Sequence, residues 1–300
     1  MGGLRRSVCP ERTWETVAAR PHPRLRPGVH GYRGFRMALG RPRRRLELPI
    51  GAVTLMLGFQ GSLRISDPTR PSPAADFTSV LKGLGTHAGQ GEHNGSLYGV
   101  EVVLEPWVAF TLFGVAMHEL AETVITPGEL LGPRVHDLTD ALAALPGWPE
   151  RFQLLDTVLP AWAAGGPPCA PPVVAAWREL VRTGGTVPIR RLTALTGWGS
   201  RTLEKRFREQ IGLPPKTAAR VLRLRRALRL LARGRVPAQV AAASGYCDQA
   251  HFTRECTAMT GLPPRRLHLA RTASTTALMA HDRMRGEVTS IVLTDQRPSR

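Results

Sequence analysis

The chain has 300 residues, of which 42% are hydrophobic, and this is enough to bury a core in each of about two domains. Its formal net charge of +18 at pH 7 favours a polyanionic partner such as nucleic acid. Four cysteines without framework spacing argue against a disulfide scaffold, and no apolar stretch is long enough for a membrane span or a signal peptide, so we expect a reducing, cytoplasmic location.

The positive charge is divided unevenly along the chain. Residues 1–45 carry a net charge of +10, residues 46–186 a net charge of −7, and residues 187–267 a net charge of +13. An acidic middle followed by a basic block predicts two domains with different partners. The basic block is the expected polyanion-binding domain, because lysine and arginine release condensed counterions from phosphates.

The first part of the chain predicts a β-rich domain. Residues 1–28 are rich in arginine and proline and are expected to be disordered. Residues 29–115 contain short segments with the alternation of strands, separated by glycine and proline turns, which favours a small barrel or sandwich. The expected strands are Gly31–Met37, Ala52–Phe59, Leu63–Ile65 and Leu97–Leu104, and Ser66–Phe77 is an expected exposed loop.

Helical spacing follows over residues 116–186. Met117–Val124, Val135–Ala144 and Pro149–Leu159 have apolar residues at helix-like intervals. Residues 163–172 contain four prolines and two glycines, the composition of a semi-rigid linker. We place the domain boundary there, between a domain at 29–162 and a second one at 173–268. Residues 269–300 are expected to form a flexible tail.

The basic block contains one pattern twice. Gly197 and Gly245 lie 48 positions apart, and Gly212 and Gly261, each followed by Leu-Pro-Pro, lie 49 apart. Each copy has a short apolar helix, a glycine that supplies the positive φ of a tight turn, and a second helix that ends at the next glycine. Two such copies predict two helix-turn-helix units.

The two units differ in their capping and core residues. In the first, Ile189–Leu195 is the short helix, and Ser200 is expected to cap a second helix that ends at Gln210, with Leu203 and Phe207 facing inward. In the second, Pro237 starts the short helix and Asp248 is the expected cap. Phe252 and Cys256 then repeat the inward pair.

One long helix is expected between the units, over Lys216–Leu231. Its apolar stripe is Val221, Leu224, Leu228 and Leu231, and five arginines cover its other faces. If this helix is rigid, both second helices can enter successive major grooves on one face of DNA, about 34 Å apart.

Residues 170–268 resemble the DNA-binding domain of AraC-type transcriptional regulators. The resemblance is carried by the stretches 206–216, 219–223 and 240–254, which cover the end of the first unit, the start of the long helix and most of the second unit. It implies seven helices, two helix-turn-helix units and promoter binding. The β-rich segment resembles, much more distantly, the cupin-like N-terminal domains of related regulators, which serve effector binding or dimerisation.

The resemblance also implies which residues read DNA. Arg201 and Lys205 of the first unit and Gln249, Ala250 and Arg254 of the second take the family's base-reading positions. Arginine can bond guanine and glutamine can bond adenine in a bidentate manner, whereas Ala250 can only touch a thymine methyl group. Thr202 and Thr253 are further base-contact candidates beside these five. The phosphate-contact candidates are Arg208 and Arg235, together with the helix starts at Ser200 and Asp248.

Metal and catalytic readings have weaker support. His87 and His93 with Glu92 and Glu101 lack the spacing of a cupin metal site. His118 and Glu119 begin like a metalloprotease helix, but Glu122 stands where the second histidine is needed. Cys247, His251 and Cys256 are three residues of the types that bind zinc, but Cys256 takes a core position. We therefore expect no metal, no cofactor and no catalytic residue.

The sequence therefore predicts an α+β protein with a cupin-like N-terminal domain and an all-α C-terminal DNA-binding domain. The expected function is a transcription factor, with double-stranded DNA as its partner and a small effector, a homodimer and RNA polymerase as further candidate partners. The alternative is a cupin-like or DNA-modifying enzyme that is tethered to DNA by the same helices.

Overall fold

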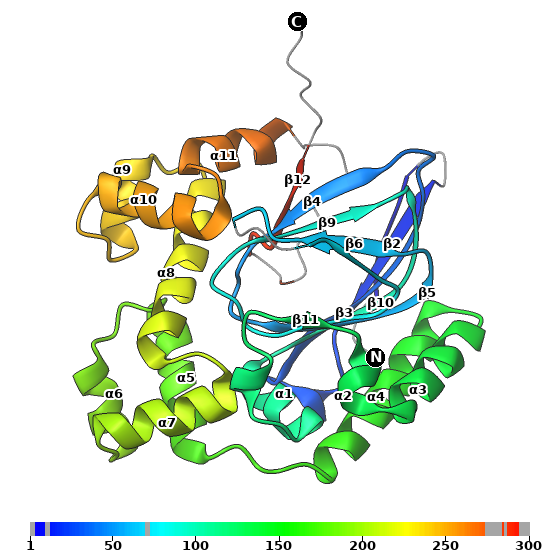
Figure 1. The fold of residues 1–300 in the computed structure, drawn as a ribbon, viewed down its shortest axis with the longest axis horizontal. Coiled ribbons are helices and arrows are strands. Elements are labelled where there is room, and N and C mark those ends of the chain that lie inside the picture. The colour runs from blue at the N-terminus through cyan, green and yellow to red at the C-terminus, as the bar shows by residue number, and fades with distance from the viewer. Residues whose placement is uncertain (1–3, 10–12, 70–72, 274–283, 285–286, 294–300) are drawn as a thin grey trace, which may run out of the picture.

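The computed structural model describes residues 4–9, 13–69, 73–273, 284 and 287–293. Figure 1 shows a sheet-rich N-terminal part beside a helical C-terminal part, which confirms the predicted α+β class. The two parts share one cluster of buried hydrophobic residues, which runs from Val17 in the sheets to Leu267 in the last helix.

Two antiparallel sheets form the N-terminal part. In the described residues the larger sheet has seven strands in the order β1–β2–β3–β10–β5–β8–β11, and the smaller has five in the order β12–β4–β9–β6–β7. The strands of the larger sheet are β1 (Arg5–Val8), β2 (Trp14–Ala19), β3 (Val29–Ala38), β5 (Val53–Gln60), β8 (Val80–Lys82), β10 (Ser96–Leu104) and β11 (Val124–Ile125). Those of the smaller are β4 (Arg43–Glu47), β6 (Leu63–Ser66), β7 (Ala75–Phe77), β9 (Gly89–His93) and β12 (Ser290–Leu293).

Helices cover the outer face of the larger sheet. Tyr32 of β3 stacks on Phe152, and Trp148 packs where Gly34 leaves room, because a Cβ at Gly34 would lie 2.2 Å from the Trp148 ring. The Tyr32 hydroxyl donates to Asp156 over 2.9 Å. The helices of this part are η1 (Pro23–Leu25), α1 (Pro106–Phe113), η2 (Met117–Glu119), α2 (Pro127–Leu131), α3 (Pro133–Ala144) and α4 (Trp148–Ala164).

Three expectations for this part were wrong. Residues 5–8 and 14–19, expected to be disordered, form β1 and β2, and Trp14 and Val17 of β2 are buried. The expected loop Ser66–Phe77 ends in β7, which pairs with β6. The expected helix Met117–Val124 contains only the short η2, because Glu122 takes φ 61° and β-branched Val124 pairs with β8.

In the part of the chain that the structure describes, seven helices follow the proline-rich segment 165–170, the number that the resemblance implies. Helix α8 separates the first pair of short helices from the second, and its predicted apolar stripe is buried. The helices are α5 (Pro171–Thr183), α6 (Ile189–Thr196), α7 (Ser200–Ile211), α8 (Pro215–Ala232), α9 (Pro237–Ala243), α10 (Gln249–Thr260) and α11 (Pro264–Ala273).

The expectation of a flexible tail over 269–300 is wrong at 269–273, which end α11, and at 290–293, where the chain returns to the sheets as β12. Strand β12 pairs with β4, with Ile291 opposite Leu46, and it packs on α11 (Figure 1). Val288 and Ile291 are buried in a groove between α8 and α11 that Leu228 and Leu267 also line. The C-terminal strand therefore lies between the sheets and the helical part and contacts both.

None of the helices in the described part of the chain combines the length and apolarity that crossing a bilayer requires.

Candidate nucleic-acid interface

The first helix-turn-helix unit is α6, the turn at Gly197 and α7. Gly197 takes φ 69°, and its N–H donates to Thr193, as the pattern predicts. The predicted cap at Ser200 is wrong by one residue. Gly199 is the capping position and its carbonyl accepts the first helical bond from Leu203, so Ser200 is the first residue of the helix and no side chain caps it.

The second unit is α9, the turn at Gly245 and α10. Gly245 takes φ 78°. The predicted cap is confirmed here, because the Asp248 carboxylate accepts a hydrogen bond from the His251 N–H over 2.6 Å. A carboxylate at this end of α10 also interacts favourably with the helix dipole.

The inward residues of both units are buried as predicted. Leu203 and Phe207 in α7, and Phe252 and Cys256 in α10, are at most 1% exposed. Burial raises the pKa of the Cys256 thiol to about 12, so it stays protonated and packs as a small apolar group. No cluster of three metal-ligating side chains that could hold an ion occurs in the described residues, Cys247 and His251 included.

The predicted base-contact side chains lie on the outer faces of the two second helices. Arg201, Thr202 and Lys205 of α7 and Gln249, Ala250 and Arg254 of α10 are exposed, and Thr253 is half-buried. In the described part of the chain, no hydrogen bond or ion pair engages the side chains of Arg201, Lys205 or Arg254. These cationic groups are thus available to a partner, which is the requirement for reading base edges.

The arginines of α8 have a different role. Arg220 donates to Glu255 over 2.9 Å, Arg225 and Arg229 both donate to Glu287, and Arg226 donates to the Thr183 carbonyl. These four side chains thus hold α8 to its neighbours. The positive charge that the sequence places on this helix is used within the protein.

Glu255 is a structural residue that sequence reasoning missed. It is buried in α10, pairs with Arg220 and with Arg223 of α8, and lies 3.3 Å from the His251 ring. The i,i+4 spacing of His251 and Glu255 was the available signal. The carboxylate fixes α10 on α8 and so sets the direction in which Gln249 and Arg254 point.

The predicted phosphate contacts are at the edges of the same surface. Arg208 is exposed on α7, and Arg235 is exposed in the turn between α8 and α9. Ser200 and Asp248 stand at the N-terminal ends of α7 and α10, where backbone N–H groups lack helical partners. Their contact with phosphate stays a prediction.

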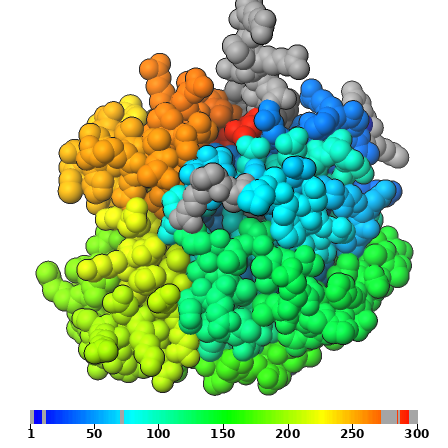
Figure 2. Space-filling view, viewed as in Figure 1, coloured from blue at the N-terminus to red at the C-terminus, as the bar shows by residue number. Residues whose placement is uncertain are grey.

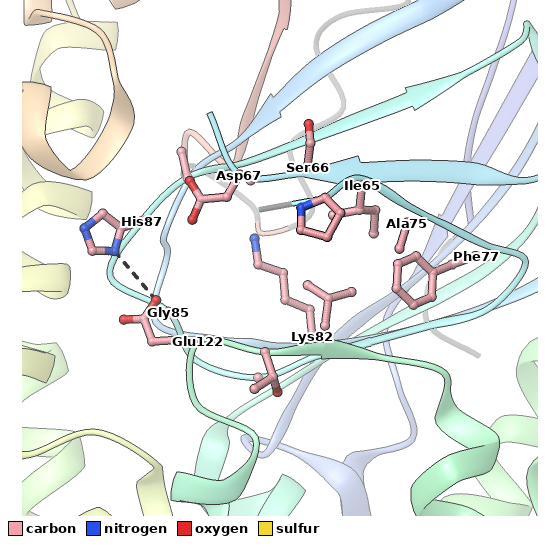
Figure 3. Close-up of a pocket in the computed structure, with 15 residues that line it drawn as sticks. Ile65, Ser66, Asp67, Ala75, Phe77, Lys82, Gly85, His87 and Glu122 are labelled. Atoms are coloured by element: carbon pink, nitrogen blue, oxygen red, sulfur yellow. Dashed lines mark ion pairs between the residues drawn. The ribbon is translucent and has the colours of Figure 1, made fainter. Parts of the chain in front are cut away.

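The N-terminal part contains a cavity of about 320 Å³ between the two sheets (Figure 3). Ile65, Phe77 and Val124 supply apolar walls, and Lys82 points into the cavity from β8. His87 and Glu122 lie together at one end, with 3.7 Å between the ring and the carboxylate. The combination of apolar walls and a few polar groups is typical of a site for a small organic molecule.

The other histidine and carboxylates considered for a metal are separated. Glu101 pairs with Arg33 over 2.9 Å, and Glu92 lies opposite Arg44 in β4. His93 is 5% exposed and accepts a hydrogen bond from the Gly95 N–H. His118 and Glu119 are exposed on η2.

We expect His93 to make the protein sensitive to acid. Burial, with Arg43 and Arg45, lowers its pKa from 6.5 to about 4, so the folded state excludes a proton that the unfolded state binds. Stability is therefore lost as the pH falls from 6.5 towards 4, by roughly 2 kcal/mol at pH 5. Urea unfolding at pH 7 and pH 5 should show a smaller loss for His93→Gln than for the wild type, with exposed His118→Gln as the control. An equal loss of stability between pH 7 and pH 5 in His93→Gln and in the wild type would contradict the assignment.

One comparison with known proteins finds a match within the C-terminal region. A family model described as a helix-turn-helix domain matches residues 192–269. A comparison with curated proteins found no match. Among solved structures, ToxT from Vibrio cholerae O395 is 10% identical over 86% of this chain and 97% of its own, with a TM-score of 0.42. The AraC-like transcriptional activator CuxR is 13% identical over 82% of this chain and 100% of its own, with a TM-score of 0.26. The family-model match shows that residues 192–269 form a helix-turn-helix domain of the AraC type.

Proposed function

We propose that this protein is a transcription regulator that reads two successive major grooves of a promoter, and that a small molecule in the N-terminal cavity modulates it. The observation that carries the proposal is the pair of exposed helices α7 and α10, each with unpaired cationic or amide side chains on its outer face. Figure 1 shows α8 between them. Figure 2 shows both units at the surface along one side of the molecule.

The length of α8 supports the two-groove arrangement. Its 18 residues span about 27 Å at 1.5 Å per residue. Successive major grooves on one face of DNA are about 34 Å apart, so a spacer helix of this length is of the same order as the groove separation. Glu255 and Glu287 tie α8 to its neighbours, which favours a fixed separation.

The cavity supports a small effector. Its volume suits a compact organic molecule, and Lys82, Asp67 and Glu122 line it beside an apolar wall. A homodimer and a contact with RNA polymerase stay predictions of the family resemblance. The described residues hold no cluster that favours the alternative of a metal-dependent enzyme.

Selection of bound DNA from a random pool tests the proposed function. We expect a site with two half-sites about 10 base pairs apart, bound at least 10³-fold more tightly than random DNA. Affinity should fall steeply with salt, because each phosphate contact releases counterions. Binding to the selected DNA that is no tighter than binding to random DNA would overturn the proposal.

A further inference from the structure

Two segments of the cavity wall each contact a different helix-turn-helix unit. One wall segment is 83–89, which joins β8 to β9, and the other is 117–124, which joins η2 to β11. Figure 3 shows their polar residues His87 and Glu122 facing each other at the end of the cavity nearest the helical part.

Segment 83–89 contacts the end of α10, the proposed recognition helix of the second unit. The Ala88 N–H donates to the Met259 carbonyl over 2.7 Å. Met259 lies in the last turn of α10, where carbonyls lack a partner within the helix. The cavity wall therefore supplies a backbone partner to the helix that carries Gln249 and Arg254.

Segment 117–124 contacts the end of α7, the proposed recognition helix of the first unit. Helix η2 packs on α7, and Gly212, which ends α7, takes φ 108°. A Cβ at Gly212 would lie 3.0 Å from the Met117 carbonyl oxygen, so the two backbones approach as closely as glycine allows.

Thr86, His87 and Glu122, here called the rim cluster, join the two segments. The Glu122 carboxylate accepts from the Thr86 N–H over 2.8 Å and from the Thr86 hydroxyl over 2.5 Å. The Glu122 N–H donates to the Leu84 carbonyl over 2.8 Å. Glu122 also holds φ 61°, a left-handed conformation that residues other than glycine seldom adopt, so surrounding contacts must maintain it.

We propose that Glu122 is a positioning residue for DNA reading. By joining the segment that contacts α10 to the segment that contacts α7, the rim cluster sets the placement of the two recognition helices relative to each other. An occupant of the cavity that takes over the Glu122 hydrogen bonds releases this link and changes the half-site spacing that the protein reads. This inference rests on the proposed function, because it names how the cavity would act on the DNA-reading helices.

Amide hydrogen exchange of the full chain without DNA tests the link directly. Glu122→Ala should speed exchange at least tenfold at Ala88 and in residues 209–213, on both sides of the rim cluster. Glu122→Gln keeps an acceptor for Thr86 and should stay near the wild type. Glu119→Ala removes an exposed carboxylate from the same segment and is the matched control. If Glu122→Ala does not fold, Thr86→Val removes the hydroxyl bond to Glu122 from the opposite wall and should speed exchange at the same positions by a smaller factor, because the Thr86 N–H still donates to Glu122.

Selection from DNA pools with half-site spacings from 8 to 13 base pairs supplies the second readout, and the spacing range is about one helical turn. The wild type, Glu119→Ala and Glu122→Gln should favour one spacing, whereas Glu122→Ala should bind several spacings within threefold of each other. Exchange changes confined to 119–125, or one unchanged spacing preference in Glu122→Ala, would overturn the inference. If the wild type itself selects no DNA site, the proposed function fails, whereas the exchange experiment still decides whether the rim cluster links the two helices.

Discussion

Replacing Arg254 by alanine is expected to weaken binding to the selected DNA site by about 5- to 150-fold, the value of one bidentate arginine–guanine pair. Affinity for random DNA should hardly change, because the contact proposed for this side chain is with a base edge. Arg254 is exposed on α10, and in the described residues no acceptor engages it. Binding isotherms on selected and random duplexes at one salt concentration measure the difference.

Arg208→Ala is the matched control for Arg254→Ala. Arg208 is also an exposed arginine on a recognition helix, but it is a predicted phosphate contact. Its loss should weaken binding equally on all sequences and reduce the slope of log affinity against log salt by about 1. If the two variants lose the same affinity on both kinds of DNA, α10 does not read bases through Arg254.

Phe207→Ala is expected to lower the free energy of unfolding by about 3–5 kcal/mol, the usual cost of removing a fully buried aromatic side chain. Phe207 is 0% exposed, and its ring lies 6.3 Å from that of Trp177. Because α7 carries Arg201 and Lys205 on its opposite face, loss of this anchor should also abolish specific binding through the first unit.

Urea unfolding monitored by circular dichroism measures the effect of Phe207→Ala. Arg206→Ala, one residue earlier and exposed on the same helix, should change the midpoint little, since its ion pair with Glu209 is at the surface. A midpoint for Phe207→Ala within error of the wild type would show that α7 is anchored elsewhere.

The helical part could be predicted from the sequence because its signals are local. Glycine at a helix–helix turn, aspartate at a cap and apolar residues at helical intervals lie within one or two turns of each other, and Gly245, Asp248 and Phe252 behave as expected. The predicted cap at Ser200 lies one position after the observed cap at Gly199, because glycine also suits the capping position.

The remaining features depend on contacts between residues far apart in the sequence. The composition of residues 1–28 predicts disorder. Trp14 and Val17 are nevertheless buried, because β2 pairs with β3, and composition carries no information about strand pairing. The pairing of Glu122 with Thr86 could not be predicted, because the two residues lie 36 positions apart. The pairing of Glu287 with Arg225, over 62 positions, carries no periodic signal at all.

The position of β12 has a consequence for how the protein is made. Strand β4 begins at residue 43, but its neighbour on one side is formed by residues 290–293. During synthesis the smaller sheet therefore stays incomplete until nearly the whole length described here has left the ribosome. Val288 and Ile291 of the same C-terminal segment fill the groove between α8 and α11. The helical part and the sheets therefore reach their final arrangement together, after both have been translated.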